Sequence, residues 1–122
     1  MTAVFDSYAW IEYFAGTEKG GKVRAILQSS EPKYTPAVCV TEVKNKYLKA
    51  GLNPDANLRF MMEHTTLIDI SGEIASQAAD AMHDEKLHTI DAIIYAAAKK
   101  VKGTLITGDQ HFKKLPNVSM LE

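Results

Sequence analysis

Short apolar segments of strand length alternate with longer segments of helical periodicity along almost the whole chain. The first apolar run, Ala3-Val4-Phe5, ends at Asp6, and Trp10, Ile11 and Phe14 then follow at helical spacing. Strands that alternate with helices indicate parallel strands joined by right-handed crossovers. We therefore expect an α/β fold with a central parallel sheet, whose strands lie at residues 3–5, 33–34, 66–70, 104–107 and 118–120.

Capping residues predict where the helices begin and end. Thr35 followed by Pro36 is typical of an N-cap with proline at the first helical position. Thr89 is the expected N-cap of a helix over residues 90–102, which is apolar on nearly all sides until Lys99 and is therefore predicted to be buried. Other helices are expected after Ser7 up to Gly16, over residues 19–28, from Pro36 to Gly51, from residues 53–55 through Met62, and from Ser71 through Met82.

The length of 122 residues suits one domain, and we expect residues 1–122 to form it. No apolar stretch approaches the roughly 20 residues that a membrane-spanning helix needs. The amino-terminal residues lack the basic start of a secretory signal. We therefore expect a cytoplasmic protein with no membrane contact.

Net charge and cysteine content exclude several classes of protein. The formal net charge of −1 argues against a generally basic nucleic-acid binder, so a polyanion would need a local basic patch or a metal ion that screens nearby acids. The single cysteine, Cys39, excludes an internal disulfide framework and a cysteine-ligated zinc cluster. Cys39 lies in an apolar run, and we expect it in the core.

Four acids lie where the predicted strands and helices meet. Asp6 directly follows the first strand, and Asp109 follows the fourth strand by one glycine. Glu42 lies in the second turn of the helix after the second strand, and Asp91 in the first turn of the buried helix. Open parallel sheets place their functional crevice outside the carboxyl ends of the strands. All four side chains are thus predicted at one edge of the sheet.

Each acid alone has an ordinary interpretation, as a helix cap, a partner of the helix dipole or a solvated residue. Together they would repel one another and raise each other's pKa unless a cation lay among them. Oxygen ligands without cysteine or paired histidine suit Mg²⁺ or Mn²⁺. Such an ion favours hydrolysis of a phosphodiester by activated water, with either one or two ions.

At these residues the chain resembles a PIN-domain ribonuclease, in particular a VapC-type toxin. The resemblance runs nearly from end to end, and its motifs occur in the order and spacing of that family. The segments that carry it are Val4-Phe5-Asp6-Ser7 with Trp10-Ile11, Val40-Thr41-Glu42-Val43, His88-Thr89-Ile90-Asp91-Ala92-Ile93-Ile94 with Ala96-Ala97, and Leu105-Ile106-Thr107-Gly108-Asp109-Gln110-His111-Phe112.

The resemblance implies a three-layer α/β/α sandwich and Mg²⁺- or Mn²⁺-dependent endonuclease activity on RNA. It also implies a homodimer that a partner antitoxin holds inactive by reaching into the site. Thr107 and Ser7 match polar positions that support the site. The acidic positions of the family, which are its metal ligands, are matched by Asp6, Glu42, Asp91 and Asp109.

The chain departs from the family in one place. Many relatives carry a further acid near the end of the last motif, where this chain has Gln110 and His111. The sequence therefore does not decide between one metal ion and two. A lone histidine beside a turn more often lies in solvent than on a phosphate, so we expect His111 to be solvated.

Three other functions are alternatives to an RNA-cutting toxin. A phosphoaspartyl hydrolase with Asp6 as nucleophile usually has a second aspartate two residues later, where this chain has Tyr8. A PIN domain that binds but does not cut would not need all four acids. A nuclease that matures one RNA without an antitoxin remains an alternative to the toxin.

Overall fold

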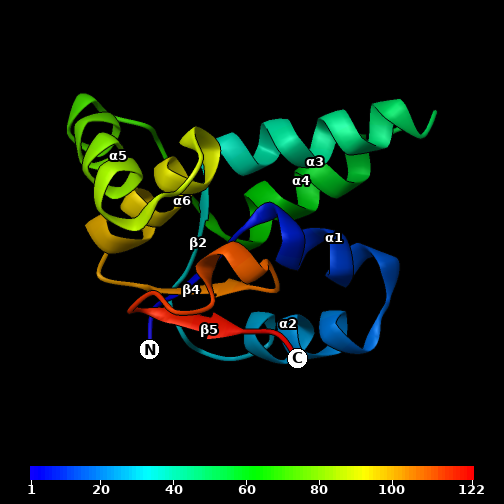
Figure 1. The fold of residues 1–122 in the computed structure, drawn as a ribbon. Helices are drawn as coiled ribbons and strands as arrows, with labels where there is room; N and C mark the ends of the chain where they lie inside the picture. The colour runs from blue at the N-terminus through cyan, green and yellow to red at the C-terminus, as the bar shows by residue number, and fades with distance from the viewer.

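The computed structural model describes residues 1–122 and has a five-stranded sheet at its centre. All four strand pairings are parallel, and the strand order is β3-β2-β1-β4-β5 (Figure 1). The predicted parallel sheet is therefore confirmed. The strands are β1 (Ala3–Phe5), β2 (Lys33–Pro36), β3 (Thr66–Ile68), β4 (Thr104–Thr107) and β5 (Val118–Met120).

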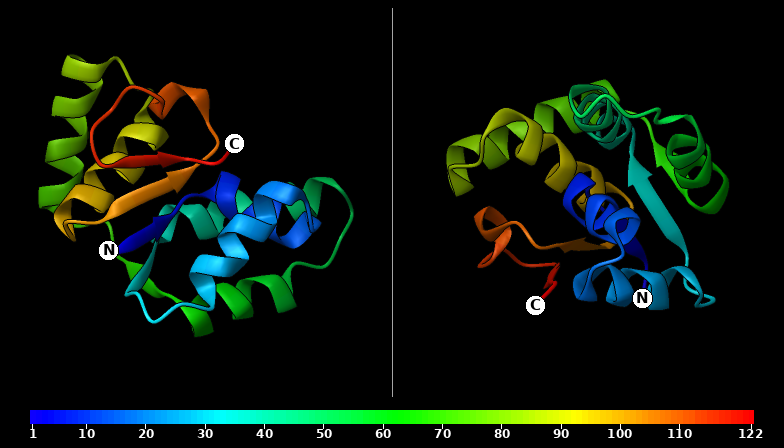
Figure 2. Two further views of the ribbon diagram at one scale, coloured as in Figure 1. Left: turned by 90° about the horizontal axis from the view of Figure 1, so that it is seen from below. Right: turned by 90° about the vertical axis from the view of Figure 1, so that its right-hand side faces the viewer.

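Helices cover both faces of the sheet and give the expected three-layer α/β/α sandwich. Helices α5 and α6 lie on one face, and α1, α2 and α4 lie on the other (Figure 2). The bounds are α1 (Ser7–Ala15), α2 (Glu18–Leu27), α3 (Ala37–Lys49), α4 (Asp55–His64), α5 (Gly72–Glu85) and α6 (Thr89–Lys100), with a short 3₁₀ helix η1 (Gln110–Phe112) after β4.

The core is divided by the sheet because side chains of a strand alternate between its faces. In β1, Val4 packs with Cys39 on the α5–α6 side, whereas Phe5 packs with Trp10 on the α1 side. All three residues of β1 are fully buried, as expected of a central parallel strand. Helix α3 contributes Cys39 to one half of the core and Val43 to the other. The predicted burial of Cys39 is confirmed.

The predicted helix start at Thr35 and Pro36 is wrong, because both residues belong to β2. Pro36 occupies the N-cap position of α3, with no side-chain capping bond. The reason lies in the core: the fully buried Trp10 needs a partner for its indole N–H. Thr35 Oγ1 accepts that hydrogen bond at 3.0 Å and also lies 2.7 Å from Thr65 Oγ1.

Two further boundaries of helices differ from the prediction. The N-cap of α6 is His88 rather than Thr89, and that of α1 is Asp6 rather than Ser7. Gly103, which follows the predicted end of α6, is not left-handed, because Lys102 (φ 55°) takes the left-handed conformation there. Gly103 is required by packing instead, because a Cβ there would lie 2.6 Å from the Val4 side chain.

Other local predictions are confirmed. Gly16 and Gly51 lie just after α1 and α3, where the sequence placed the ends of these helices, and both are left-handed, with φ of 69° and 74°. Ser71 caps α5 by accepting a hydrogen bond from the Ile74 amide. Met62 on α4 is 48% exposed. None of the helices is both long enough and apolar enough to span a membrane.

Candidate active site

The four acids predicted from the sequence meet at the carboxyl end of the sheet. Because β1 and β4 are neighbours, the residues that follow them, Asp6 and Asp109, lie close together. The negative charge of Asp109 acts on Asp6, on Glu42 and on Asp91. These positions agree with the sequence-based prediction of one cluster, contributed by β1, β4 and the helices α3 and α6.

Asp6 lies deepest in the cluster and is only 3% exposed. Its Oδ1 accepts a hydrogen bond from the Ala9 amide at 2.8 Å, which caps α1. Burial raises the pKa of Asp6 to about 7, opposed by hydrogen bonds from the Thr107 side chain and the Ala9 amide. The charges of Asp109 and Glu42 raise the pKa of Asp6 further.

Glu42 is held in place by Ser7. The Ser7 hydroxyl donates a hydrogen bond to Glu42 Oε1 at 2.8 Å, which links the first turn of α1 to the second turn of α3. Partial burial raises the pKa of Glu42, the Ser7 hydrogen bond lowers it, and the charges of Asp91 and Asp109 raise it. Ser7 thus orients the carboxylate of Glu42.

Thr107 connects the two aspartates that follow the central strands. It is fully buried at the end of β4, and its Oγ1 accepts a hydrogen bond from the Asp109 amide at 3.0 Å. The same side chain hydrogen-bonds Asp6. Thr107 therefore fixes the loop that carries Asp109 relative to the carboxylate of Asp6.

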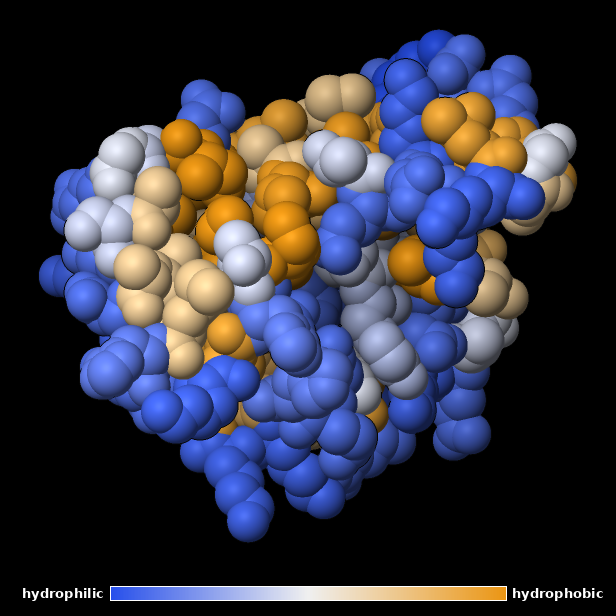
Figure 3. Space-filling view, turned by 45° about the horizontal axis from the view of Figure 1, so that its top comes forward, coloured by the Kyte–Doolittle hydropathy of each residue, from blue (hydrophilic) through white to orange (hydrophobic).

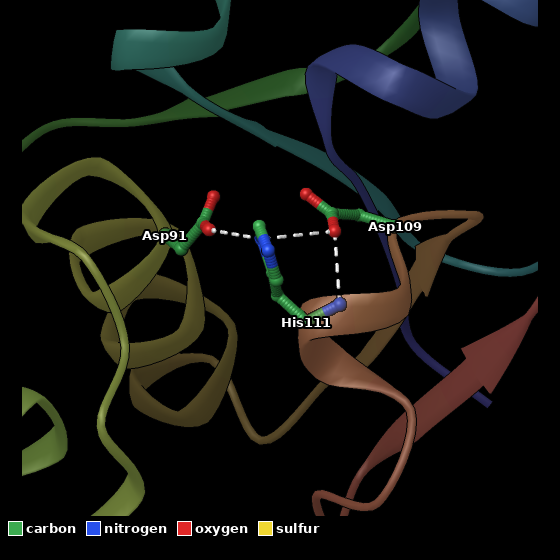
Figure 4. A group of neighbouring side chains, drawn as sticks. All are labelled: Asp91, Asp109 and His111. Carbon is green, nitrogen blue, oxygen red and sulfur yellow. Dashed lines mark hydrogen bonds and ion pairs between the residues drawn. The ribbon is translucent and has the colours of Figure 1, made fainter.

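His111 also lies in the cluster, which the sequence analysis did not predict. Its Nδ1 is 3.4 Å from Asp91 Oδ2 and 3.2 Å from Asp109 Oδ1, and Figure 4 shows the imidazole between the two carboxylates. Burial and the charge of Asp109 raise the pKa of Asp91, and His111 lowers it. His111 is solvent-exposed as expected, at 64%, but its inner nitrogen faces the site. The sequence contained one signal for a place of His111 in the site, which is its position two residues after Asp109 in a tight turn.

The sequence model of the PIN domain family matches residues 3–118. The chain belongs to the PIN domain family. This membership does not support the phosphoaspartyl hydrolase considered above. Comparison with curated protein sequences finds no match.

Several solved structures with the same fold are toxins or toxin–antitoxin complexes. A toxin–antitoxin complex from Klebsiella pneumoniae has a TM-score of 0.85 at 24% identity, covering 99% of this chain and 98% of that one. A DNA-bound VapBC from Salmonella typhimurium has a TM-score of 0.74 at 16% identity, with coverage of 98% and 96%. A sarcin–ricin loop cleaving toxin from Mycobacterium tuberculosis has a TM-score of 0.76 at 16% identity, with coverage of 94% and 95%.

PIN nucleases generally use a divalent metal, and the residues of this PIN domain fit one. No lysine or arginine forms an ion pair with any of the four acids, and His111 is the only basic residue that does. Burial and mutual repulsion raise the pKa of three of them, which are Asp6, Glu42 and Asp91. A cation would offset that repulsion, and carboxylate oxygens are the ligands that Mg²⁺ and Mn²⁺ prefer.

Gly108 allows the loop with Asp109 to pass closely beneath Tyr8. A Cβ at Gly108 would overlap the Tyr8 ring, 2.6 Å from its Cζ. We expect Gly108→Ala to displace this loop, to lower the free energy of unfolding by about 1–3 kcal/mol, and to reduce nuclease activity. Urea unfolding measures the change in stability, and a nuclease assay measures the change in activity.

Tyr8→Ala provides the matched control, because it removes the ring that the new methyl group would meet. Adding Gly108→Ala to Tyr8→Ala should cost far less stability and activity than Gly108→Ala costs alone. Equal losses in both backgrounds would show that the Tyr8 contact is not what requires glycine.

Proposed function

We propose that this PIN domain is a divalent-metal-dependent endoribonuclease that hydrolyses RNA phosphodiesters in the cytoplasm. The observation that carries the proposal is the cluster of Asp6, Glu42, Asp91 and Asp109 at the carboxyl end of the sheet, without lysine or arginine partners. Nuclease activity is the chemistry of PIN-domain toxins. The likeness to a toxin that cleaves the sarcin–ricin loop supports RNA as the substrate.

The side chains of the site divide into ligands and positioning groups. Asp6, Asp91, Asp109 and Glu42 would hold Mg²⁺ or Mn²⁺, which when bound lowers the pKa of water and neutralises charge on the phosphoryl group. The other two predicted residues of the site, Ser7 and Thr107, orient the carboxylates of Glu42 and Asp6 through the hydrogen bonds described above.

A random-sequence pool of single-stranded RNA tests the activity without knowledge of the target. Metal-free protein should leave the pool intact, and addition of Mn²⁺ should produce discrete cuts that sequencing of the products locates. Asp6→Asn should leave the pool intact with Mn²⁺ as well. If Asp6→Asn cuts like the wild type, the site is wrongly assigned.

We further propose that the nuclease is the toxin of a toxin–antitoxin pair. The support is its likeness over nearly the full length to chains from toxin–antitoxin complexes. An antitoxin that reaches into the acidic site should block cleavage at equimolar ratio. If the protein is instead a processing nuclease without an antitoxin, cleavage should be confined to one RNA. If it is a PIN module that does not cleave, it should bind metal without cutting RNA.

A homodimer is proposed as well. Apolar side chains that a second copy of the chain could cover include Met82 on α5 and Ile90 on α6, which are 38% and 39% exposed. Figure 3 shows hydrophobic surface gathered on the face that bears α5, α6 and the start of α3. Light scattering should give the mass of two chains, and Ile90→Asp should shift the mass toward one chain.

A further inference from the structure

Asp91, Asp109 and His111 place three possible ligand atoms within 4.8 Å of one another. They come from the first turn of α6, from the loop after β4 and from η1. Figure 4 shows the imidazole of His111 between the two carboxylates. The donor set is therefore mixed, with one nitrogen and two carboxylates.

The distances suit one metal ion better than two hydrogen bonds. Adjacent ligands of an octahedral ion with bonds of about 2.1 Å lie roughly 3.0 Å apart, close to the 3.2 and 3.4 Å between Nδ1 and the carboxylate oxygens. Charge-assisted N–H···O bonds are shorter, at about 2.7–2.9 Å. A single Nδ1 proton also serves only one acceptor, yet Nδ1 faces Asp91 and Asp109 alike.

The backbone fixes this position of His111 independently of the imidazole. Asp109 Oδ1 accepts a hydrogen bond from the His111 amide at 2.9 Å and so caps η1. The side chain of His111 is 64% exposed and takes no part in the core. The neighbouring ring of His88 lies edge-on, with centroids 6.1 Å apart. His111 can therefore be replaced without disturbing the fold.

We propose that His111 Nδ1 is a ligand of the same ion that Asp91 and Asp109 bind, and that this nitrogen makes the site prefer Mn²⁺ to Mg²⁺. Imidazole nitrogen binds transition metals well, whereas Mg²⁺ favours oxygen ligands. The inference rests on the proposed function, because the ion is the one expected to support RNA cleavage.

Pulsed electron paramagnetic resonance of the Mn²⁺-loaded protein without RNA tests the ligand directly. A bound imidazole gives a nitrogen coupling to Mn²⁺. We expect this coupling in the wild type and in His88→Gln, and its loss in His111→Gln. Calorimetry should show that His111→Gln weakens Mn²⁺ binding by about tenfold or more, a loss typical of altered metal shells, with a far smaller change for Mg²⁺.

The outcomes separate this inference from the proposed function. No nitrogen coupling in the wild type, or unchanged Mn²⁺ affinity in His111→Gln, would overturn the ligand role while leaving RNA cleavage to be judged by its own assay. A coupling that His111→Gln removes, in a protein that cuts no RNA, would support the ligand and contradict the nuclease.

Discussion

Replacing Asp91 by asparagine should slow RNA cleavage by about a thousandfold, which corresponds to about 4 kcal/mol of lost transition-state stabilisation. Asparagine keeps the shape of the side chain but removes the charge that faces Asp109 and His111. Asp91 is partly exposed in the first turn of α6, so the lost interaction with the helix dipole costs only about 0.3–1 kcal/mol. Initial rates at saturating Mn²⁺ measure the effect.

The matched control for this substitution is Asp80→Asn. Asp80 is an exposed aspartate on α5, outside the acidic cluster. The substitution Asp80→Asn removes the same charge from a helix of the same protein. The cleavage rate of this variant should therefore stay within about twofold of the wild-type rate. Equal rates for Asp91→Asn and the wild type would remove Asp91 from the site.

Asp6→Asn should stabilise the metal-free protein at pH 8 while abolishing its activity. In the folded chain the pKa of Asp6 is about 7, against an ordinary value of 3.8 for an aspartate in water. Each pKa unit corresponds to about 1.4 kcal/mol, so keeping Asp6 ionised in the fold at pH 8 costs on the order of 4 kcal/mol. Asparagine avoids this cost and remains a good N-cap for α1.

The sign of the pH dependence follows from proton binding. Between about pH 4 and pH 7 the folded state holds a proton on Asp6 that the unfolded state has lost. The stability of the metal-free wild type should therefore fall as the pH rises through this window. The advantage of Asp6→Asn should be small near pH 4 and reach its full size above pH 7.

Urea unfolding in the presence of a chelator measures this difference at pH 5 and pH 8. Mn²⁺ should reverse the order at pH 8, because it binds the ionised carboxylates of the wild type and stabilises the fold. An Asp6→Asn protein that is no more stable than the wild type in chelator at pH 8 would contradict the raised pKa.

The parallel sheet and the cluster of acids could be predicted because both follow from position along the chain. Asp6 and Asp109 come just after apolar strands, and parallel strands present their carboxyl ends at one edge. Asp91 was identifiable because a carboxylate on an apolar helix is costly unless it has a partner. The arrangement of motifs then indicated the family, which the match over residues 3–118 confirms.

The features that were missed depend on contacts between distant segments. Thr35 looked like an N-cap, and only the packing of Trp10 on the sheet shows why it belongs to β2. His111 looked like a solvated residue because its approach to Asp91 depends on how η1 and α6 lie together. The contact of Thr35 with Trp10 has no local signature in the sequence, whereas His111 had one signal, its position two residues after Asp109.

The most direct test of the central claim is the end chemistry of RNA cut by the wild type, with Mn²⁺ removed by chelator and then added back. Cleavage should stop with the chelator and resume with Mn²⁺. The products should lack a 2′,3′-cyclic phosphate, because water rather than the neighbouring 2′-hydroxyl attacks the phosphorus. Cleavage that persists in chelator, or products ending in a cyclic phosphate, would contradict a metal-dependent hydrolysis at Asp6, Glu42, Asp91 and Asp109.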